Sequence, residues 1–173
     1  MLRKRPTKIL AISPGTREMG VAVLEGSSLI YFGVKTLRRG KLPDRVLRQG
    51  GRIVERLIDE YDPQVLALEK TFYAGSKRSS ILHVFCKEIM AVAKEKGINF
   101  FEYPPTMVRK IVCGDGMATK KETARVIVNR FPELSEYLIE PKWYSERQRE
   151  RYWMNMFDAV AVALACHQKD LDK

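Results

Sequence analysis

Two acidic side chains stand at positions that the hydrophobic pattern alone does not explain. The apolar run Val65-Leu66-Ala67-Leu68 is typical of a buried strand, but it ends in Glu69. Asp158 precedes the alanine-rich part of a last helix, which the spacing predicts over residues 152–168. Carboxylates that a fold brings together could hold a hard divalent cation against a phosphate. The alternatives are an ordinary strand-end acid and an acid near a helix N-terminus, where the helix dipole favours it.

The overall charge makes a polyanion the expected partner. The chain has 173 residues, with 31 Lys and Arg against 21 Asp and Glu, and a formal net charge of +10. Composition leaves two interpretations open, a nucleic-acid binder and a basic protein that is merely soluble. Net charge gives information about partners and solubility but not about the fold.

The cysteines and the N-terminus indicate a cytoplasmic protein. Cys86, Cys113 and Cys166 are an odd number at wide spacings, which argues against a disulfide framework and against a zinc site. A reducing cytosol fits this usage best. Residues 1–8 are basic but lead into only a short apolar stretch, so we expect neither a signal peptide nor a membrane anchor.

Hydrophobic periodicity predicts strands at the start of the chain and a mixture of helices and strands after them. The expected strands are residues 9–13, 20–24, 28–34, 65–69 and 98–103, and the expected helices are 44–61, 79–96, 106–112, 120–131 and 152–168. Gly50-Gly51 is expected to weaken the first of these helices. Residues 132–151 are polar and basic, and we expect an insertion there, either a mobile basic segment or a plain surface helix.

Four segments recur in the order and spacing of a known family. They are Ile9-Leu10-Ala11-Ile12-Ser13-Pro14-Gly15-Thr16, Leu66-Ala67-Leu68-Glu69, the stretch from Glu102-Tyr103 through Val108-Arg109-Lys110 and Gly114-Asp115-Gly116 to Lys120, and Asp158 to Leu164. On these segments, which span nearly the whole chain, the sequence resembles the RuvC family of Holliday-junction resolvases. The resemblance implies an RNase H-like α/β fold, with a five-stranded mixed sheet and helices on both faces. The length of the chain predicts one domain over residues 1–173, within which residues 132–151 are the expected basic insertion.

The resemblance further implies partners and cofactors. The family acts as a homodimer on branched, four-way DNA, and each of its two sites uses acidic side chains to hold two Mg²⁺ or Mn²⁺ ions against the scissile phosphate. A branch-migration helicase is a possible further partner. The expected helix over residues 79–96 has more apolar positions than one face needs, and a dimer interface would use the surplus.

The match to the family's acidic residues is incomplete. Glu69 and Asp158 stand at two of its four acidic positions, but Ser13 and Asn155 occupy the other two. Their neutral oxygens can coordinate a cation without neutralising it, so we expect at least one weakened metal site. The residues implied as catalytic are Glu69, Asp158, Lys120, Ser13 and Asn155, and the same set without Lys120 is implied as metal ligands.

The resemblance also implies a DNA-binding face. Its residues here are Phe72, Tyr73, Lys77, Arg78, Arg109 and Lys121. Phe72 or Tyr73 would stack on an unpaired base at the junction centre, and the basic residues would contact phosphates. Arg109 stands where the family carries a lysine, and Lys120 matches a second lysine near the cleaved phosphate.

Three functions are therefore in competition. The first is a metal-dependent endodeoxyribonuclease that nicks branched DNA symmetrically. The second is a catalytically weakened junction-binding protein, which Ser13 and Asn155 favour. The third is a nuclease of the same fold that acts on RNA or on a different branched substrate.

Overall fold

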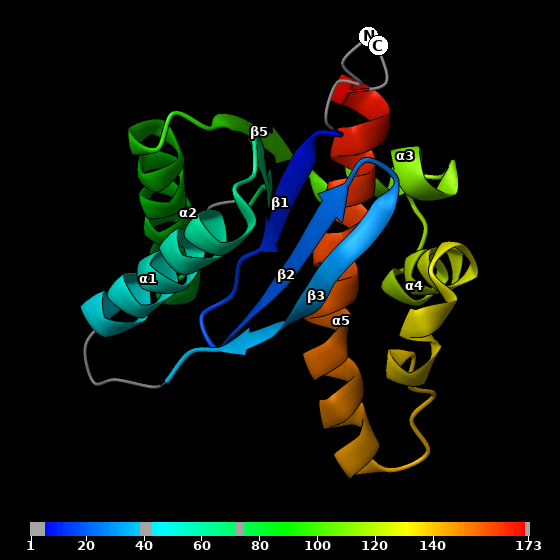
Figure 1. Ribbon diagram of the computed structural model, residues 1–173. Coiled ribbons are helices and arrows are strands. Elements are labelled where there is room, and N and C mark those ends of the chain that lie inside the picture. The colour runs from blue at the N-terminus through cyan, green and yellow to red at the C-terminus, as the bar shows by residue number, and fades with distance from the viewer. Residues whose placement is uncertain (1–5, 39–42, 72–74, 172–173) are drawn as a thin grey trace, which may run out of the picture.

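Five strands form one mixed sheet in the computed structural model, which describes residues 6–38, 43–71 and 75–171 (Figure 1). The strands are β1 (Lys8–Ser13), β2 (Glu18–Glu25), β3 (Ser28–Thr36), β4 (Val65–Glu69) and β5 (Asn99–Tyr103). The helices are α1 (Pro43–Tyr61), α2 (Lys77–Glu95), α3 (Pro105–Cys113), α4 (Lys120–Arg130) and α5 (Tyr144–Cys166), with a 3₁₀ segment η1 (Pro132–Tyr137) and a π-helical turn η2 (His167–Leu171). The sheet order is β3-β2-β1-β4-β5, and the expected five-stranded mixed sheet is confirmed.

The central strands bring two strand ends side by side. Five of the six residues of β1 and four of the five residues of β4 are buried. Such continuous burial is typical of strands that are covered on both faces. β1 and β4 are parallel, with Ile12 opposite Leu68. The next residues, Ser13 and Glu69, therefore leave the sheet at the same edge.

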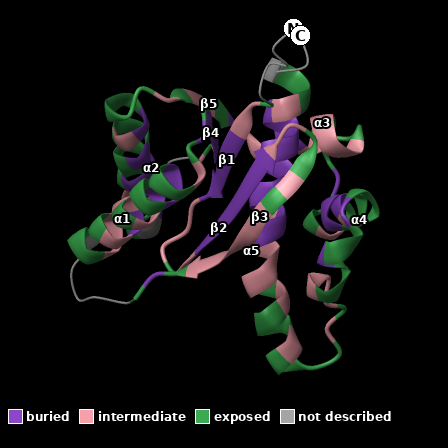
Figure 2. Ribbon diagram, viewed as in Figure 1, coloured by how far each residue is buried: buried purple, intermediate pink, exposed green. Residues whose placement is uncertain are grey.

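Helices cover the two faces of the sheet in separate layers (Figures 1 and 2). Along β1, Ile9 and Ala11 pack into a core with α5, whereas Leu10 and Ile12 pack into a second core with α1 and α2. Successive side chains of a strand point to opposite faces, so one apolar strand supplies both cores. The buried, alanine-rich half of α5 lies against the first face and fixes the position of the side chains that precede it.

One glycine lets α5 approach the sheet closely. A Cβ atom on Gly20 of β2 would lie 1.7 Å from the backbone oxygen of Asn155 in α5, so no side chain fits there. Gly20 is paired with Ser13 across the β1–β2 ladder. The close approach therefore sets Asn155 and the next turn of α5 beside the end of β1.

A second glycine lies where α1 meets α2. A Cβ on Gly50 would lie 2.1 Å from the ring of Phe85, which is buried between the two helices. The Gly50-Gly51 pair does not interrupt α1, which is continuous from residue 43 to residue 61. The missing side chain serves the packing of α1 on α2 rather than interrupting the helix.

The largest departure from the expected elements is the start of α5. The other helices and strands begin and end within two residues of their predicted bounds, but α5 begins at Tyr144 instead of residue 152. Its first turns carry too few apolar residues to show helical periodicity, and polar contacts hold them instead. The expected insertion thus consists of η1, a short connection and an extension of α5. No helix in the described ranges is long and apolar enough to cross a membrane.

Candidate active site

The ends of β1 and β4 place a hydroxyl group against a carboxylate. The Ser13 Oγ donates a hydrogen bond to Glu69 Oε2 at 3.2 Å. Ser13 is a buried polar residue with 6% of its surface exposed, and this contact satisfies its hydroxyl group. The two side chains meet because the strands are parallel neighbours that end at the same level. Ser13 therefore holds Glu69 at the sheet edge.

The second carboxylate comes from the middle of α5 and contacts a lysine from α4. Lys120 Nζ and Asp158 Oδ2 form an ion pair at 2.5 Å. The Asp158 side chain is 16% exposed, whereas that of Lys120 is 54% exposed. Lys120 thus reaches from solvent onto a largely buried acid, which is the arrangement needed to contact a phosphate that enters from outside.

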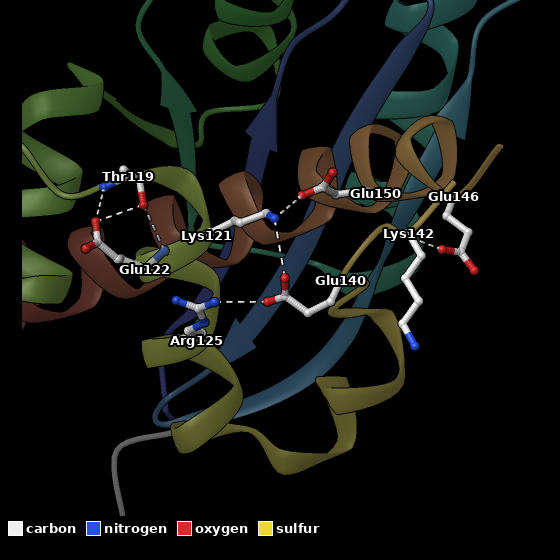
Figure 3. A network of polar contacts seen from close by, with 8 residues as sticks. All are labelled: Thr119, Lys121, Glu122, Arg125, Glu140, Lys142, Glu146 and Glu150. Carbon is white, nitrogen blue, oxygen red and sulfur yellow. Dashed lines mark hydrogen bonds and ion pairs between the residues drawn. The ribbon is translucent and has the colours of Figure 1, made fainter. Parts of the chain in front are cut away.

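A capping box fixes Lys120 at the start of α4. The Thr119 Oγ1 accepts a hydrogen bond from the backbone N–H of Glu122, and Glu122 Oε2 accepts one from the backbone N–H of Thr119 at 2.6 Å (Figure 3). These reciprocal bonds satisfy backbone donors that a helix start otherwise leaves free. The side chain of Lys120 is therefore projected from a defined first turn.

Both carboxylates and two cations surround one narrow pocket. It is lined by Glu69, Pro105, Val108, Arg109, Lys120, Thr123, Asp158 and Ala161. These residues come from β4, α3, α4 and α5, so the pocket forms only when all four elements are in place. Glu69, Asp158, Lys120 and Arg109 were each expected at the site from the resemblance, and the fold brings them together.

Both carboxylates resist ionisation. Burial and, to a lesser extent, the nearby Asp158 carboxylate raise the pKa of Glu69 to about 7, even though Lys120, Ser13 and Arg109 act to lower it. Burial also raises the pKa of Asp158 despite its ion pair with Lys120. Burial lowers the pKa of Lys120, but the Asp158 carboxylate outweighs this effect and leaves the pKa above its usual range. Burial therefore disfavours the charged form of each acid more than the neighbouring cations favour it.

The donor set fits one hard divalent cation better than two. Glu69 and Asp158 supply two carboxylates with raised pKa values, and a bound cation would favour their charged forms. Within the described part of the chain, no three His, Cys, Asp or Glu side chains are close enough to share a metal ion. Two divalent cations would bring four positive charges to two carboxylates, so further ligands would have to be neutral oxygens or the substrate's phosphate.

Asn155 lies one turn before Asp158 on α5, but its amide nitrogen is already bonded. The Asn155 Nδ2 donates to the backbone oxygens of Arg151 and Tyr152 at 3.1 and 3.2 Å. Only its Oδ1 atom can therefore act as a ligand. This side chain could assist a cation near Asp158 without adding negative charge.

The expected DNA-binding residues fall into two groups. Lys77 is exposed at the start of α2 and lines a hollow with Thr16, Arg17 and Ile81 beside the β1–β2 turn. This hollow places Lys77 near the sheet edge that carries Ser13. Phe72 and Tyr73 lie outside the described residues, and so does the side chain of Arg78, although Arg78 belongs to α2.

Lys121, the remaining expected DNA contact, is tied into a network of ion pairs. Its Nζ lies 3.4 Å from Glu140 and 3.2 Å from Glu150 (Figure 3). Glu140 also pairs with Arg125 at 3.0 Å. This network joins α4 to the extension of α5, and no local pattern predicts it because its members are far apart in the chain.

Two arginines of the expected basic segment belong to the extension of α5. Arg147 and Arg151 lie on α5 four residues apart, and Asn155 follows four residues later. Spacings of three and four residues place side chains on one helix face. The signal was present in the sequence, but it has meaning only if the helix reaches back to Tyr144.

Sequence comparison finds relatives over most of the chain. The family model for "Crossover junction endodeoxyribonuclease RuvC" matches residues 9–146. The protein of that name from Pseudomonas fluorescens is 32% identical over 166 residues, which cover 93% of this chain and 86% of the relative. Its namesake from Helicobacter pylori strain G27 is 29% identical over 167 residues, which cover 94% of this chain and 97% of the relative.

Solved structures share the fold. Thermus thermophilus RuvC superposes with a TM-score of 0.69 at 20% identity, covering 92% of each chain. The same protein in complex with a Holliday junction substrate gives a TM-score of 0.69 at 17% identity. The yeast mitochondrial Holliday junction resolvase Ydc2 gives a TM-score of 0.64 at 11% identity, covering 95% of this chain and 79% of Ydc2. At these identities the likeness concerns the arrangement of the elements.

Proposed function

Because the chain belongs to the RuvC family of crossover junction endodeoxyribonucleases, we propose that it binds four-way DNA junctions and hydrolyses phosphodiester bonds in them. The observation that carries this proposal is the meeting of Glu69, Asp158, Lys120 and Arg109 around one pocket. Two largely buried acids and two cations from four separate elements have no evident structural need to meet. A nuclease needs both kinds of group, since a metal ion requires acids and a phosphate requires cations.

Each side chain around the pocket would have a separate role in this reaction. Glu69 and Asp158 would hold a Mg²⁺ or Mn²⁺ ion, with the Ser13 hydroxyl and the Asn155 Oδ1 as neutral auxiliary ligands. When bound, such an ion stabilises the charge that develops on a phosphoryl group during displacement. Lys120 would leave Asp158 to contact the scissile phosphate, and Arg109 would neutralise the same group from α3.

A second candidate function is supported by the contacts around the acids. Glu69 already accepts a hydrogen bond from Ser13, and Asp158 already pairs with Lys120. These contacts partly satisfy both carboxylates by protein groups alone, so a folded site does not depend on a metal ion. A junction-binding protein with weakened cleavage would need no more than this, and it would still use the basic residues on phosphates.

Partners and location follow from the same proposal. A homodimer would place two sites on one junction, as symmetric nicking requires, and Val84 and Met90 are large apolar residues exposed on α2 that a second copy could cover. Cys86, Cys113 and Cys166 are free thiols, which suits a cytoplasmic protein. We further propose that residues 1–173 act as one domain and that a branch-migration helicase supplies the junction.

One experiment separates the two candidate functions. The purified protein is incubated with a labelled four-way junction in EDTA, and Mg²⁺ or Mn²⁺ is then added, so that binding and cleavage are measured together. Paired nicks that appear only with metal would establish the nuclease. A retained complex without nicks would establish the junction-binding protein. Binding no tighter than to a linear duplex would contradict both.

A further inference from the structure

The extension of α5 carries a row of basic and aromatic side chains that leads to the active site. Tyr144, Arg147, Arg151, Asn155 and Asp158 follow one another at spacings of three or four residues. With 3.6 residues per turn, these spacings keep all five on one face of the helix. The face extends about 21 Å from Tyr144 to Asp158, at 1.5 Å per residue. Figure 1 shows the first turns of α5 running past the end of the sheet.

The acids of the extension are engaged elsewhere, so its positive charge is not cancelled. Glu150 pairs with Lys121, and Glu146 Oε2 accepts a hydrogen bond from the backbone N–H of Lys142 at 2.7 Å (Figure 3). Among the described residues, no carboxylate lies within ion-pair distance of Arg147 or Arg151, and both arginines are exposed. Asn155, being neutral, leaves no acid on this face between Arg151 and Asp158.

Two exposed aromatic residues stand at the far end of the same row. Trp143 is 69% exposed and Tyr144 is 75% exposed. Large aromatic side chains are normally buried, and next to unpaired arginines they are typical of surfaces that contact nucleic-acid bases and sugars. The other tryptophan, Trp153, is used differently, since its ring packs against Tyr137 with 4.5 Å between centroids.

We infer that the α5 face of Tyr144, Arg147 and Arg151 binds the sugar-phosphate backbone of the DNA arm whose cleaved phosphate lies at Asp158. The inference rests on the proposed function, because it takes the pocket as the place of the scissile phosphate. Arginine suits this role, since its planar guanidinium group binds phosphate oxygens in pairs. From the helix rise, Arg151 and Arg147 contact phosphates about three to five base pairs from the cleaved bond, and the aromatic end lies about six base pairs away.

Binding of junction DNA to the full chain tests this inference with a matched control. Arg147→Gln/Arg151→Gln is compared with Arg149→Gln, which removes a charge from the opposite face of the same helix turn. We expect the double variant to weaken junction binding by about tenfold or more and to lower the slope of log Kd against log salt by about two. Arg149→Gln should weaken binding by less than about threefold. Equal losses per charge in the two variants would overturn the inference.

A chemically modified junction locates the contact. Methylphosphonate linkages replace the charged phosphates about three to five base pairs from the cleaved bond, and no other phosphate changes. If the arginines contact these phosphates, the double variant and the wild type bind the modified junction equally. If the double variant still loses about tenfold against the wild type, the arginines act elsewhere and the inference is wrong.

Trp143 supplies an independent readout. DNA binding should change the tryptophan fluorescence of the wild type, and Trp143→Phe should abolish that change because Trp153 is packed against Tyr137. A change that persists in Trp143→Phe would place the DNA away from the extension. Failure of the proposed function looks different: the wild type itself would then show no junction preference and no cleavage, whatever the variants do.

Discussion

Lys120 and Lys121 are neighbours in the first turn of α4, yet they belong to two different charged regions. Lys120 contacts the largely buried Asp158 in the pocket, whereas Lys121 contacts Glu140 and Glu150 at the surface. In the pocket, burial raises the pKa of Glu69 to about 7. At the surface, hydrogen bonds and nearby cations lower the pKa of Glu140.

The difference shows which cluster holds the fold and which is prepared for a ligand. The surface network is balanced by its own members and joins α4 to the extension of α5. The pocket holds acids whose ionisation is unfavourable, and an added cation or phosphate would change its charge balance. Acids whose pKa values are shifted in this way by burial are typical of a binding or catalytic centre.

Removing one carboxylate of the pocket should have the largest effect. We expect Glu69→Gln and Asp158→Asn each to lower metal-dependent junction cleavage by at least about 100-fold, because each removes half of the available ligand charge. Glu140→Gln removes a carboxylate from the surface network and should leave the cleavage rate within about twofold. Single-turnover cleavage measures all three. If Glu69→Gln and Glu140→Gln lowered the cleavage rate by similar factors, the pocket and the surface network would not differ in function.

The next largest difference in cleavage rate should be that between variants of Lys120 and Lys121. Lys120→Ala should lower the cleavage rate by about 100-fold, the usual effect of losing a group that stabilises charge in the transition state. Lys121→Ala should change the rate by less than about twofold, since its partners are Glu140 and Glu150. Cleavage at saturating DNA concentration separates the rate from binding. If Lys121→Ala proved as damaging as Lys120→Ala, α4 would have to turn when DNA binds.

Adding a carboxylate to the pocket should raise cleavage, whereas removing one should lower it. Ser13→Asp places a third carboxylate beside Glu69 and should raise metal-dependent cleavage by about tenfold. Without metal, the added repulsion should lower the Tm, and Mg²⁺ should restore it. Ser13→Ala is the control, because it removes the hydroxyl group without adding charge. An unchanged metal response in Ser13→Asp would show that residue 13 does not reach the cation.

The pKa shift of Glu69 should make the free energy of unfolding depend on pH, by about 3 kcal/mol between acid and alkaline solution. Folding raises the pKa of Glu69 from 4.5 to about 7, so the folded state binds the proton more tightly than the unfolded state. The resulting stabilisation is complete below about pH 4.5 and is lost as the pH rises through about 7. The metal-free protein should therefore lose stability between pH 5 and pH 8. Denaturant unfolding across that range measures this, and Glu69→Gln should flatten the profile.

The smallest effect should come from the surface network. Glu140 has a lowered pKa, so its contribution is present near neutral pH and is lost in acid. Glu140→Gln should lower the Tm slightly in dilute buffer and not at all in 1 M salt, because exposed ion pairs are screened. A large, salt-resistant loss would mean that the network is essential to folding and not merely a connection.

Much of this fold was predictable because burial leaves a periodic trace in the sequence. Apart from the start of α5, the strands and helices that flank the pocket were expected within two residues of their bounds. Glu69 and Asp158 were identified because they interrupt apolar segments at positions that match the RuvC family. The start of α5 was not predicted, since residues 144–151 are held by polar contacts with distant partners and not by an apolar stripe.

Local pattern and position along the chain were therefore enough to predict most of the elements, the two acids and the neutral Ser13 and Asn155. Which cation contacts which acid depends instead on how the elements pack. Lys120 and Asp158 are 38 residues apart, and the opposite roles of Lys120 and Lys121 depend on the direction in which α4 projects each side chain. Such directions follow from how the helices pack on the sheet, for which the spacing of residues along the chain carries no signal.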